Sequence, residues 1–215
     1  MNIFNFVNDK PNNFFNPKFS YYIGEELLDI DVDYLSKFLL SKEKDILNEY
    51  PFHSDGKTGL SKNSVTTRFV HYNLLDFKKT NFLKEYIRNT HDKFLRRLKQ
   101  NIDKNYYIQC WYNVMRKGEQ IKKHHHAEDQ ETYLSGHICV KTNNTNTYYE
   151  SPYYKKDYAS KNIPGKITLF PGWVTHHTDQ QSENTERITI AFDILTKDLF
   201  DKTIENNMKE HWVLI

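Results

Sequence analysis

Histidines in two parts of the chain have the spacing expected of metal ligands. His124 and His126 are separated by one residue, and His176 follows an apolar run about fifty residues later. Alternate residues of a β-strand point to the same face, so His124 and His126 can direct both imidazoles at one ion while His125 faces away. A histidine from a distant strand completes a facial set with open positions. The pattern therefore predicts a site for Fe(II) or another first-row divalent metal.

The ligand set has a second interpretation, because Glu128 stands two residues after His126. In that alternative His126 and Glu128 form the pair, and His176 completes a set of two histidines and one carboxylate. Three neutral imidazoles would leave the metal one charge more positive than a set that contains a carboxylate. A third interpretation is that the three adjacent histidines are exposed to solvent and bind nothing. The spacing of the residues leaves this choice open.

An arginine near the C-terminus adds an anion-binding group. Arg187 and Thr189 occupy alternate positions in the run Arg-Ile-Thr-Ile-Ala-Phe, so both side chains are expected on one face of a strand. A guanidinium in an apolar pocket binds a carboxylate through two hydrogen bonds. The alternative is a surface arginine that pairs with Glu183 or Glu186. With the histidines, Arg187 favours a carboxylate-bearing ligand on the open side of the metal.

Length and composition restrict the class of protein. A chain of 215 residues predicts one domain with a substantial core, and a net charge of +2 indicates no general attraction to nucleic acid or membranes. Without a signal-peptide pattern or a run of 18 apolar residues, we expect no membrane contact and a cytoplasmic protein, in the host cytoplasm if the source is viral. Cys110 and Cys139 lie in strand-like runs and are expected to be buried thiols.

The elements that must position these residues follow from hydrophobic periodicity. Residues 1–20 predict an extended arm or edge strand, and helical spacing predicts helices over about 33–50 and 80–103, with caps at Asp31 or Asp33 and at Thr80. A short turn is expected over 73–77 and a closing helix over 197–209. From residue 106 the period changes to two, which predicts strands over 106–115, 132–141, 146–149, 166–170, 173–178 and 187–195.

Many short strands after two helices predict a mainly β fold, a sandwich or jelly roll with helices outside one sheet. We expect one domain over 1–215, in which an arm and supporting helices (1–105) precede a β core (106–196) and a C-terminal helix or tail (197–215). The stretch 142–165 carries five tyrosines. It is expected either to border the site or to be an ordinary surface loop.

An ordered series of motifs resembles the 2-oxoglutarate- and Fe(II)-dependent oxygenase superfamily, and most closely the oxygenases of marine bacteria and tailed phages. The resemblance covers about 106–195, with a weaker likeness over 55–68. The motifs that carry it are Trp111, Gly118-Glu119, His124-His125-His126, Leu134-Ser135-Gly136, Leu169 to His176, and Arg187-Ile188-Thr189.

The resemblance implies a double-stranded β-helix fold, cupin-like, with Fe(II) as cofactor and 2-oxoglutarate as co-substrate. It implies that His124, His126 and His176 bind the metal and that Arg187 and Thr189 bind the distal carboxylate of 2-oxoglutarate. It further implies that an unidentified substrate is hydroxylated while succinate and CO2 are released. The residues expected to line the cavity are Asn113 beside the co-substrate, and Gln109, Trp111, Ser135, His137 and Trp173.

Two departures from the superfamily pattern keep other functions open. Most members have Asp or Glu where this chain has His126, and many relatives have tyrosines at the positions of Ile138 and Cys139, where only His137 could offer a similar polar group. One alternative is a cupin-type dioxygenase with three histidines that does not use 2-oxoglutarate. Another is a non-enzymatic jelly-roll protein, a metal-binding or phage accessory protein. The substrate is open between a small molecule, a protein and a nucleotide, and so is the oligomeric state.

Overall fold

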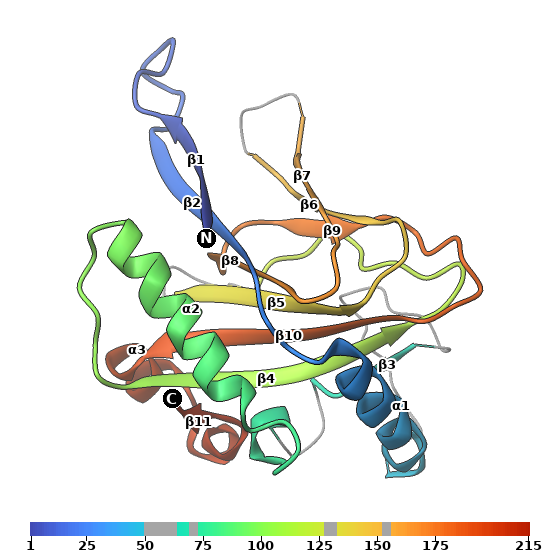
Figure 1. The fold of residues 1–215 in the computed structure, drawn as a ribbon. Coiled ribbons are helices and arrows are strands. Elements are labelled where there is room, and N and C mark those ends of the chain that lie inside the picture. Colours follow the sequence, from blue (N-terminus) through green and yellow to red (C-terminus); the bar gives the residue numbers. More distant parts are fainter. Residues whose placement is uncertain (50–63, 69–72, 127–132, 152–155) are drawn as a thin grey trace.

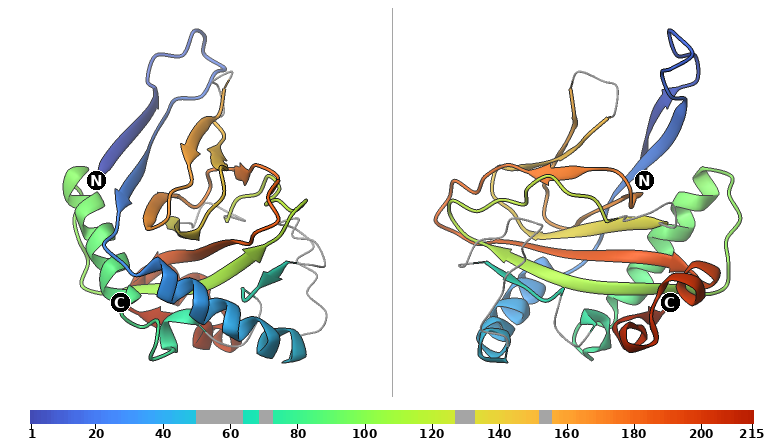
Figure 2. Two further views of the ribbon diagram at one scale, coloured as in Figure 1. Left: turned by 45° about the vertical axis from the view of Figure 1, so that its right-hand side comes forward. Right: turned by 180° about the vertical axis from the view of Figure 1, so that it is seen from behind.

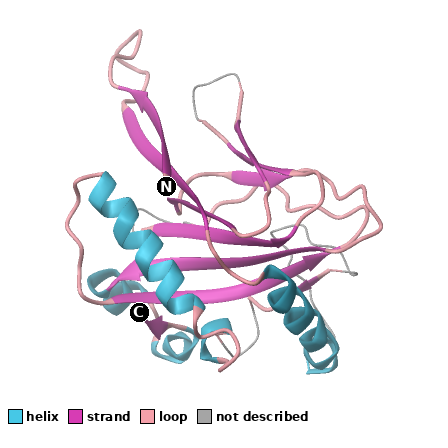
Figure 3. Ribbon diagram, viewed as in Figure 1, coloured by secondary structure: helices cyan, strands magenta, loops and turns pink. Residues whose placement is uncertain are grey.

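The computed structural model describes residues 1–49, 64–68, 73–126, 133–151 and 156–215. Figure 1 and the left view of Figure 2 show three layers, with helices below a large sheet and a small sheet above it. Figure 3 distinguishes the helices from the strands by colour. The two principal helices are α1 (Val32–Glu49) and α2 (Leu83–Arg97). The predicted mainly β fold with flanking helices is therefore confirmed.

The larger sheet has the strand order β1-β2-β8-β5-β10-β4-β11, and β3 pairs with β4 outside that path. The smaller sheet has the order β7-β6-β9. All pairings are antiparallel, as expected of a jelly roll. The strands are β1 (Asn2–Asn8), β2 (Phe19–Leu27), β3 (Val65–Thr66), β4 (Tyr106–Met115), β5 (Leu134–Lys141), β6 (Asn146–Tyr149), β7 (Tyr158–Lys161), β8 (Lys166–Pro171), β9 (His176–Thr178), β10 (Arg187–Thr196) and β11 (Val213–Leu214).

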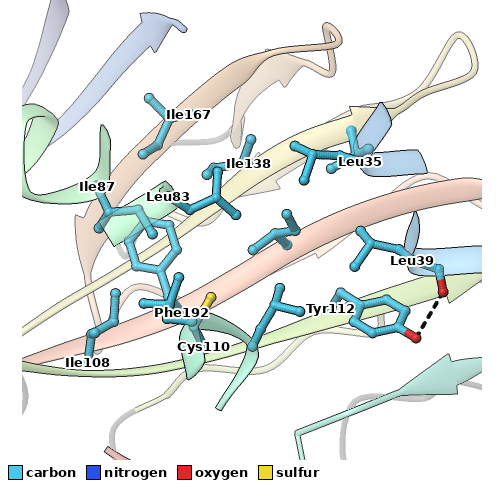
Figure 4. Close-up of a cluster of buried hydrophobic side chains, with 14 of the residues drawn as sticks. Leu35, Leu39, Leu83, Ile87, Ile108, Cys110, Tyr112, Ile138, Ile167 and Phe192 are labelled. Atoms are coloured by element: carbon cyan, nitrogen blue, oxygen red, sulfur yellow. Dashed lines mark hydrogen bonds between the residues drawn. The ribbon is translucent and has the colours of Figure 1, made fainter. Parts of the chain in front are cut away.

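The main hydrophobic core lies between the helices and the larger sheet. Figure 4 shows side chains from α1 and α2 meeting side chains from the strands. Each fully buried aliphatic or aromatic side chain contributes roughly 1.5–3 kcal/mol to folding. The hydroxyl of Tyr112 donates a hydrogen bond to the carbonyl oxygen of Leu39, 3.1 Å away, and so ties α1 to β4. The labelled core residues include Leu35, Leu39, Leu83, Ile87, Ile108, Cys110, Ile138 and Phe192.

Strand periodicity divides the residues of β4 between the two faces of the sheet. Ile108, Cys110 and Tyr112 belong to the core beneath the helices. Trp111 and Asn113 instead line a cavity between the two sheets. The same strands therefore build the core with one face and the candidate site with the other.

The helices begin and end partly as predicted. Asp31 caps α1, because its Oδ1 accepts a hydrogen bond from the backbone N–H of Tyr34 at 2.8 Å. By contrast, α2 is shorter than predicted, and Thr80 does not cap it, because its hydroxyl donates to the carbonyl oxygen of Leu74. The predicted turn over 73–77 contains a 3-10 helix, Leu74–Asp76. The predicted C-terminal helix is divided into α3 (Lys197–Thr203) and a 3-10 helix, Asn206–His211.

Two strand predictions require correction. The strand expected over 173–178 begins only at His176, because the chain turns after β8 and the N–H of Val174 bonds back to the carbonyl oxygen of Pro171. The stretch 142–165 contains an unpredicted strand, β7, which pairs with β6. Tyr153 and Tyr154 of that stretch lie outside the described residues. The N-terminal arm is confirmed as an edge hairpin of β1 and β2 that projects from the body in Figure 1.

The structure also bears on the two cysteines and on the helices as candidate membrane spans. Cys110 and Cys139 are both buried free thiols, as expected. None of the helices in the described part of the chain is long and apolar enough to cross a bilayer.

Candidate functional site

Backbone hydrogen bonds bring two segments that are distant in sequence to the same place between the sheets. The N–H of His124 donates to the carbonyl oxygen of His176 at 3.1 Å, and the N–H of His176 donates to that of His124 at 2.9 Å. The N–H of His126 donates to the carbonyl oxygen of Gly172 at 2.9 Å. This pairing places His124 and His126 beside His176, while His125 is exposed.

The three imidazoles converge through their Nε2 atoms. The Nδ1–H of His124 donates to the carbonyl oxygen of Lys122 at 2.8 Å, and that of His176 donates to the carbonyl oxygen of Val174 at 3.1 Å. Each Nε2 therefore carries the free lone pair of the neutral ring. The Nε2 atoms of His124 and His126 are 3.3 Å apart, and one ring nitrogen from each of the three histidines lies within 4.8 Å of the others.

Burial keeps two of these rings, those of His124 and His176, neutral. Burial, with a smaller contribution from neighbouring His126, lowers the pKa of His124 to about 4. Burial and the adjacent His124 hold the pKa of His176 well below its ordinary value. Because a metal binds only the neutral ring, His124 and His176 are in the ligand state at physiological pH.

A carboxylate that was not singled out in the sequence supports the third ring. Oδ1 of Asp193 lies 2.5 Å from Nδ1 of His126 and 2.6 Å from the hydroxyl oxygen of Ser135, which donates to it. Burial opposes ionisation of Asp193, but His126, Arg68 and Ser135 outweigh it and hold the pKa of the carboxyl below its usual range. Asp193 is therefore an anion that can fix the Nδ1–H tautomer of His126. Asp193 stands two residues beyond Ala191, on the same strand face as Arg187 and Thr189. This alternation is the sequence pattern from which Asp193 could have been predicted as a site residue.

Arg187 is buried in the same cavity as the histidines. Only 2% of the residue's surface is exposed, and its Nη1 donates a weak hydrogen bond to Sδ of Met115 at 3.9 Å. Among the described residues no carboxylate lies within ion-pairing distance of the guanidinium, and Nε has no hydrogen-bond partner. Burial lowers the pKa of Arg187. A guanidinium is ordinarily charged at neutral pH. An unpaired buried cation of this kind calls for an anionic ligand.

One cavity collects most of the residues that the sequence singled out. His124, His126 and His176 line it together with Arg187 and Thr189. Three further predicted residues also line it, namely Trp111, Asn113 and His137. His137 is buried and its Nε2 has no partner in the described part of the chain. Burial, with a smaller effect of Arg187, lowers its pKa to about 3, so the ring is neutral. Unpredicted lining residues are Thr66, Arg68, Ile121, Gly136, Thr147, Phe170, Thr178 and Ala191.

Other predicted residues lie elsewhere. Gln109 and Ser135 line a neighbouring cavity rather than the first one. Trp173 lines neither; it is 42% exposed, and its ring meets that of Tyr21 edge-on at 5.1 Å because the chain turns there. Glu128, the alternative carboxylate ligand, falls outside the described residues.

Comparison with known proteins shows which family the central part of the chain resembles. Residues 109–193 match the family described as "Putative 2OG-Fe(II) oxygenase". These residues contain the three histidines, Asp193 and Arg187. The site and this match together indicate the class of 2-oxoglutarate- and Fe(II)-dependent oxygenases, which implies Fe(II) as cofactor and 2-oxoglutarate as co-substrate. A search of curated protein sequences found no match.

Solved structures share the fold at low sequence identity. A prolyl-4-hydroxylase from Pseudomonas putida has a TM-score of 0.57 at 8% identity, over 81% of this chain and 92% of that chain. The viral collagen prolyl hydroxylase of Paramecium Bursaria Chlorella virus-1, in complex with 2-oxoglutarate, has a TM-score of 0.52 at 14% identity, over 80% and 94%. A prolyl hydroxylase from Trichoplax adhaerens has a TM-score of 0.55 at 10% identity, over 85% and 87%.

These structures confirm the double-stranded β-helix and leave the substrate open. An epimerase from nogalamycin biosynthesis, described as dependent on α-ketoglutarate, has a TM-score of 0.54 at 10% identity, over 80% of this chain and 77% of that chain. The same fold therefore serves hydroxylases and an epimerase, so the fold does not by itself define the reaction. The narrower likeness to proteins of marine bacteria and phages stays a prediction.

Proposed function

We propose that this oxygenase binds Fe(II) through Nε2 of His124, His126 and His176, that Arg187 binds the distal carboxylate of 2-oxoglutarate, and that the enzyme hydroxylates a C–H bond. The observation that carries the proposal is the buried guanidinium of Arg187 without an anionic partner among the described residues, in the cavity that also contains the three histidines. A buried charge without a partner costs several kcal/mol, which a dicarboxylate ligand would offset.

The donor set fits the metal. Imidazole nitrogens suit first-row divalent ions, and a facial set of three leaves positions open for ligands. Each of the three Nδ1 atoms is held by an oxygen acceptor, so each ring keeps its orientation before the metal binds. We propose Asp193 as the residue that orients His126 and supplies the negative charge that three neutral ligands lack.

The polar side chains around Arg187 fit the co-substrate. Thr189 and Asn113 are paired across β10 and β4, so a hydroxyl and an amide stand beside the guanidinium in the cavity. His137 offers a further buried ring nitrogen, the group for which relatives are expected to use tyrosine. The cavity has about 50 Å³ of free volume, so binding of a five-carbon dicarboxylate requires lining side chains to move outward.

Bound Fe(II) and 2-oxoglutarate would supply the oxidative chemistry, in which O2 is consumed, 2-oxoglutarate becomes succinate and CO2, and the second oxygen atom enters the substrate. The chain itself holds the two ligands in place and limits water. Phe170, Ile121 and Trp111 form apolar walls of the cavity, and a dry wall strengthens the attraction between Arg187 and a carboxylate.

The test measures binding and turnover separately. Calorimetry should show that metal-loaded protein binds 2-oxoglutarate, and iron-loaded protein should release succinate in the presence of O2 and ascorbate. Metal-loaded protein that does not bind 2-oxoglutarate would contradict the proposal. The cupin-type alternative would instead show oxygen uptake with a thiol or diketone and no dependence on 2-oxoglutarate.

A further inference from the structure

A second cavity adjoins the first at the metal-binding histidines. It has a volume of about 280 Å³, and Arg68 and His126 line both cavities. This volume is near the lower end of pockets for small molecules, which are roughly 300–1,000 Å³. Its other lining residues include Gln109, Ser135, Asp193, Leu195, Ile204 and Trp212.

The two cavities lie toward opposite ends of the same strands. The pair Asn113 and Thr189 stands beside the first cavity, whereas the pair Gln109 and Asp193 stands beside the second. Four residues along a strand separate these pairs, which is about 13 Å. If Arg187 binds 2-oxoglutarate, the co-substrate occupies the first cavity, and the second is the space left beside the metal for a substrate.

Arg68 lies where the two cavities meet, and its guanidinium has N–H groups that bind no acceptor among the described residues. Its guanidinium lies over the ring of Trp111, 4.8 Å from the centroid, and its Nη2 is 3.8 Å from Oδ2 of Asp193. The guanidinium donates no hydrogen bond to an acceptor within the described ranges, although the backbone N–H of Arg68 donates to the hydroxyl of Thr66. Oδ1 of Asp193 is already taken by His126 and Ser135. The stacked, preorganised guanidinium therefore keeps its N–H groups for a ligand.

The rest of the wall is largely apolar. Leu134, Ile194, Leu195, Ile204 and Trp212 contribute aliphatic and aromatic surface. Such a wall favours a ligand with an apolar body, and Arg68 favours an anionic group at the end nearest the metal.

We propose that the second cavity binds the substrate of the oxygenase, and that this substrate is a small acid with an apolar body whose carboxylate or phosphate is bound by Arg68. The inference rests on the proposed function, because the first cavity must be filled by 2-oxoglutarate. Arg68 would be a specificity-determining residue: it selects the substrate and holds one end of it while the apolar part lies in the cavity.

The experiment compares ligands that share a six-carbon chain and differ in the charge and chemistry of the polar end. Zn(II)-loaded protein, which cannot turn over, is saturated with 2-oxoglutarate so that Arg187 is occupied. Hexanoate, hexyl phosphate and uncharged hexanamide are then titrated to millimolar concentrations by saturation-transfer NMR. We expect at least one of the two anions to bind about tenfold or more tightly than the amide. The tighter anion identifies the chemical source of the negative charge.

Variants test whether Arg68 carries the preference. Arg68→Met should bind the anions and the amide about equally. Arg97→Met, which removes an exposed arginine of α2, should keep the preference of the wild type. Equal binding of all three compounds to the wild type, no binding of any of them, or a preference that survives in Arg68→Met would each overturn the inference.

The same protein separates this inference from the proposed function. Calorimetry of the Zn(II)-loaded wild type with 2-oxoglutarate is run first. Absence of 2-oxoglutarate binding contradicts the proposed function itself. Binding of 2-oxoglutarate without a preference for anions in the second cavity contradicts only the assignment of Arg68 and the substrate class.

Discussion

Nδ1 of His126 lies 2.5 Å from Oδ1 of Asp193, and the hydroxyl of Ser135 donates to the same carboxylate oxygen. The three side chains come from different parts of the chain, and Ser135 and Asp193 face each other across β5 and β10. This contact leaves Nε2 of His126 as the ring nitrogen with the available lone pair. It also places a negative charge beside the opposite ring nitrogen, Nδ1. The proposed site of three imidazoles thereby gains a carboxylate that need not touch the metal.

Asp193→Asn should weaken metal binding. The amide oxygen can still accept the hydrogen bond from His126, so the substitution mainly removes the charge. Loss of such an outer partner typically costs about 10–100-fold in metal affinity. Competition with a chromogenic chelator measures the change. Asp179→Asn is the matched control, because Asp179 bonds to Tyr148 and Asn146 and not to the three histidines. Equal affinities of the wild type and Asp193→Asn would contradict the role of Asp193.

The identity of the ligands can be tested by single substitutions. We expect His124→Ala, His126→Ala and His176→Ala each to lose most metal binding, because two neutral nitrogens hold a first-row ion far less tightly than three. Glu128→Gln and His125→Ala should keep it. Equilibrium dialysis with Co(II) or Fe(II) measures the bound metal. Retained binding in His124→Ala together with loss in Glu128→Gln would favour the alternative set of His126, Glu128 and His176.

Arg187→Ala should weaken binding of 2-oxoglutarate by about 100-fold or more, because removing one partner of a buried ion pair costs about 3–5 kcal/mol. Arg187→Lys should recover only part of the affinity, since an ammonium group cannot form the two parallel hydrogen bonds of a guanidinium. Calorimetry on metal-loaded protein measures both. The exposed residue Arg97 provides the control, Arg97→Ala. An unchanged affinity in Arg187→Ala would show that the distal carboxylate binds elsewhere.

The metal-free protein should lose stability in mild acid, partly through His137. Its pKa falls from 6.5 to about 3 on folding, so the unfolded state takes up a proton first as the pH decreases. The stabilising effect is complete above about pH 6.5 and is lost toward pH 3, at about 1.4 kcal/mol per pH unit. Urea unfolding at pH 6.5 and at pH 5 should show that wild type loses about 2 kcal/mol more than His137→Gln. Parallel losses in the two proteins would contradict this account.

Periodicity and spacing predicted much of the fold and the candidate site for a physical reason. A strand that is buried on one face repeats every two residues, so Arg187 and Thr189 could be placed on one face of β10. The same alternation was expected of His124 and His126, but the structure has only an isolated bridge there, between His124 and His176. The core helices were predictable from their apolar stripes. Asp193 obeys the same period from Arg187, but a lone aspartate near the end of a strand carries no sign of its partner.

What escaped prediction depends on contacts between distant segments. The side chain of Arg68 follows a strand of only two residues, whose place is defined by pairing with β4. Strand β7 has the sequence Tyr-Ala-Ser-Lys, without a clear apolar alternation, and exists because its backbone pairs with β6. Trp173 was expected in the cavity, but the turn after Pro171 directs it toward Tyr21. None of these placements is encoded in local periodicity.

The reciprocal backbone bonds between His124 and His176 make two of the proposed ligands part of one small ladder. An ion held by both side chains would therefore also restrain their peptide groups. Opening of this ladder, which exposes both amides to solvent deuterium, would require the ion to leave first. In hydrogen exchange followed by NMR, metal should slow these two amides together and by similar factors, while amides of the β1–β2 hairpin keep their rates. Independent responses of the two amides would show that the ladder and the metal are uncoupled.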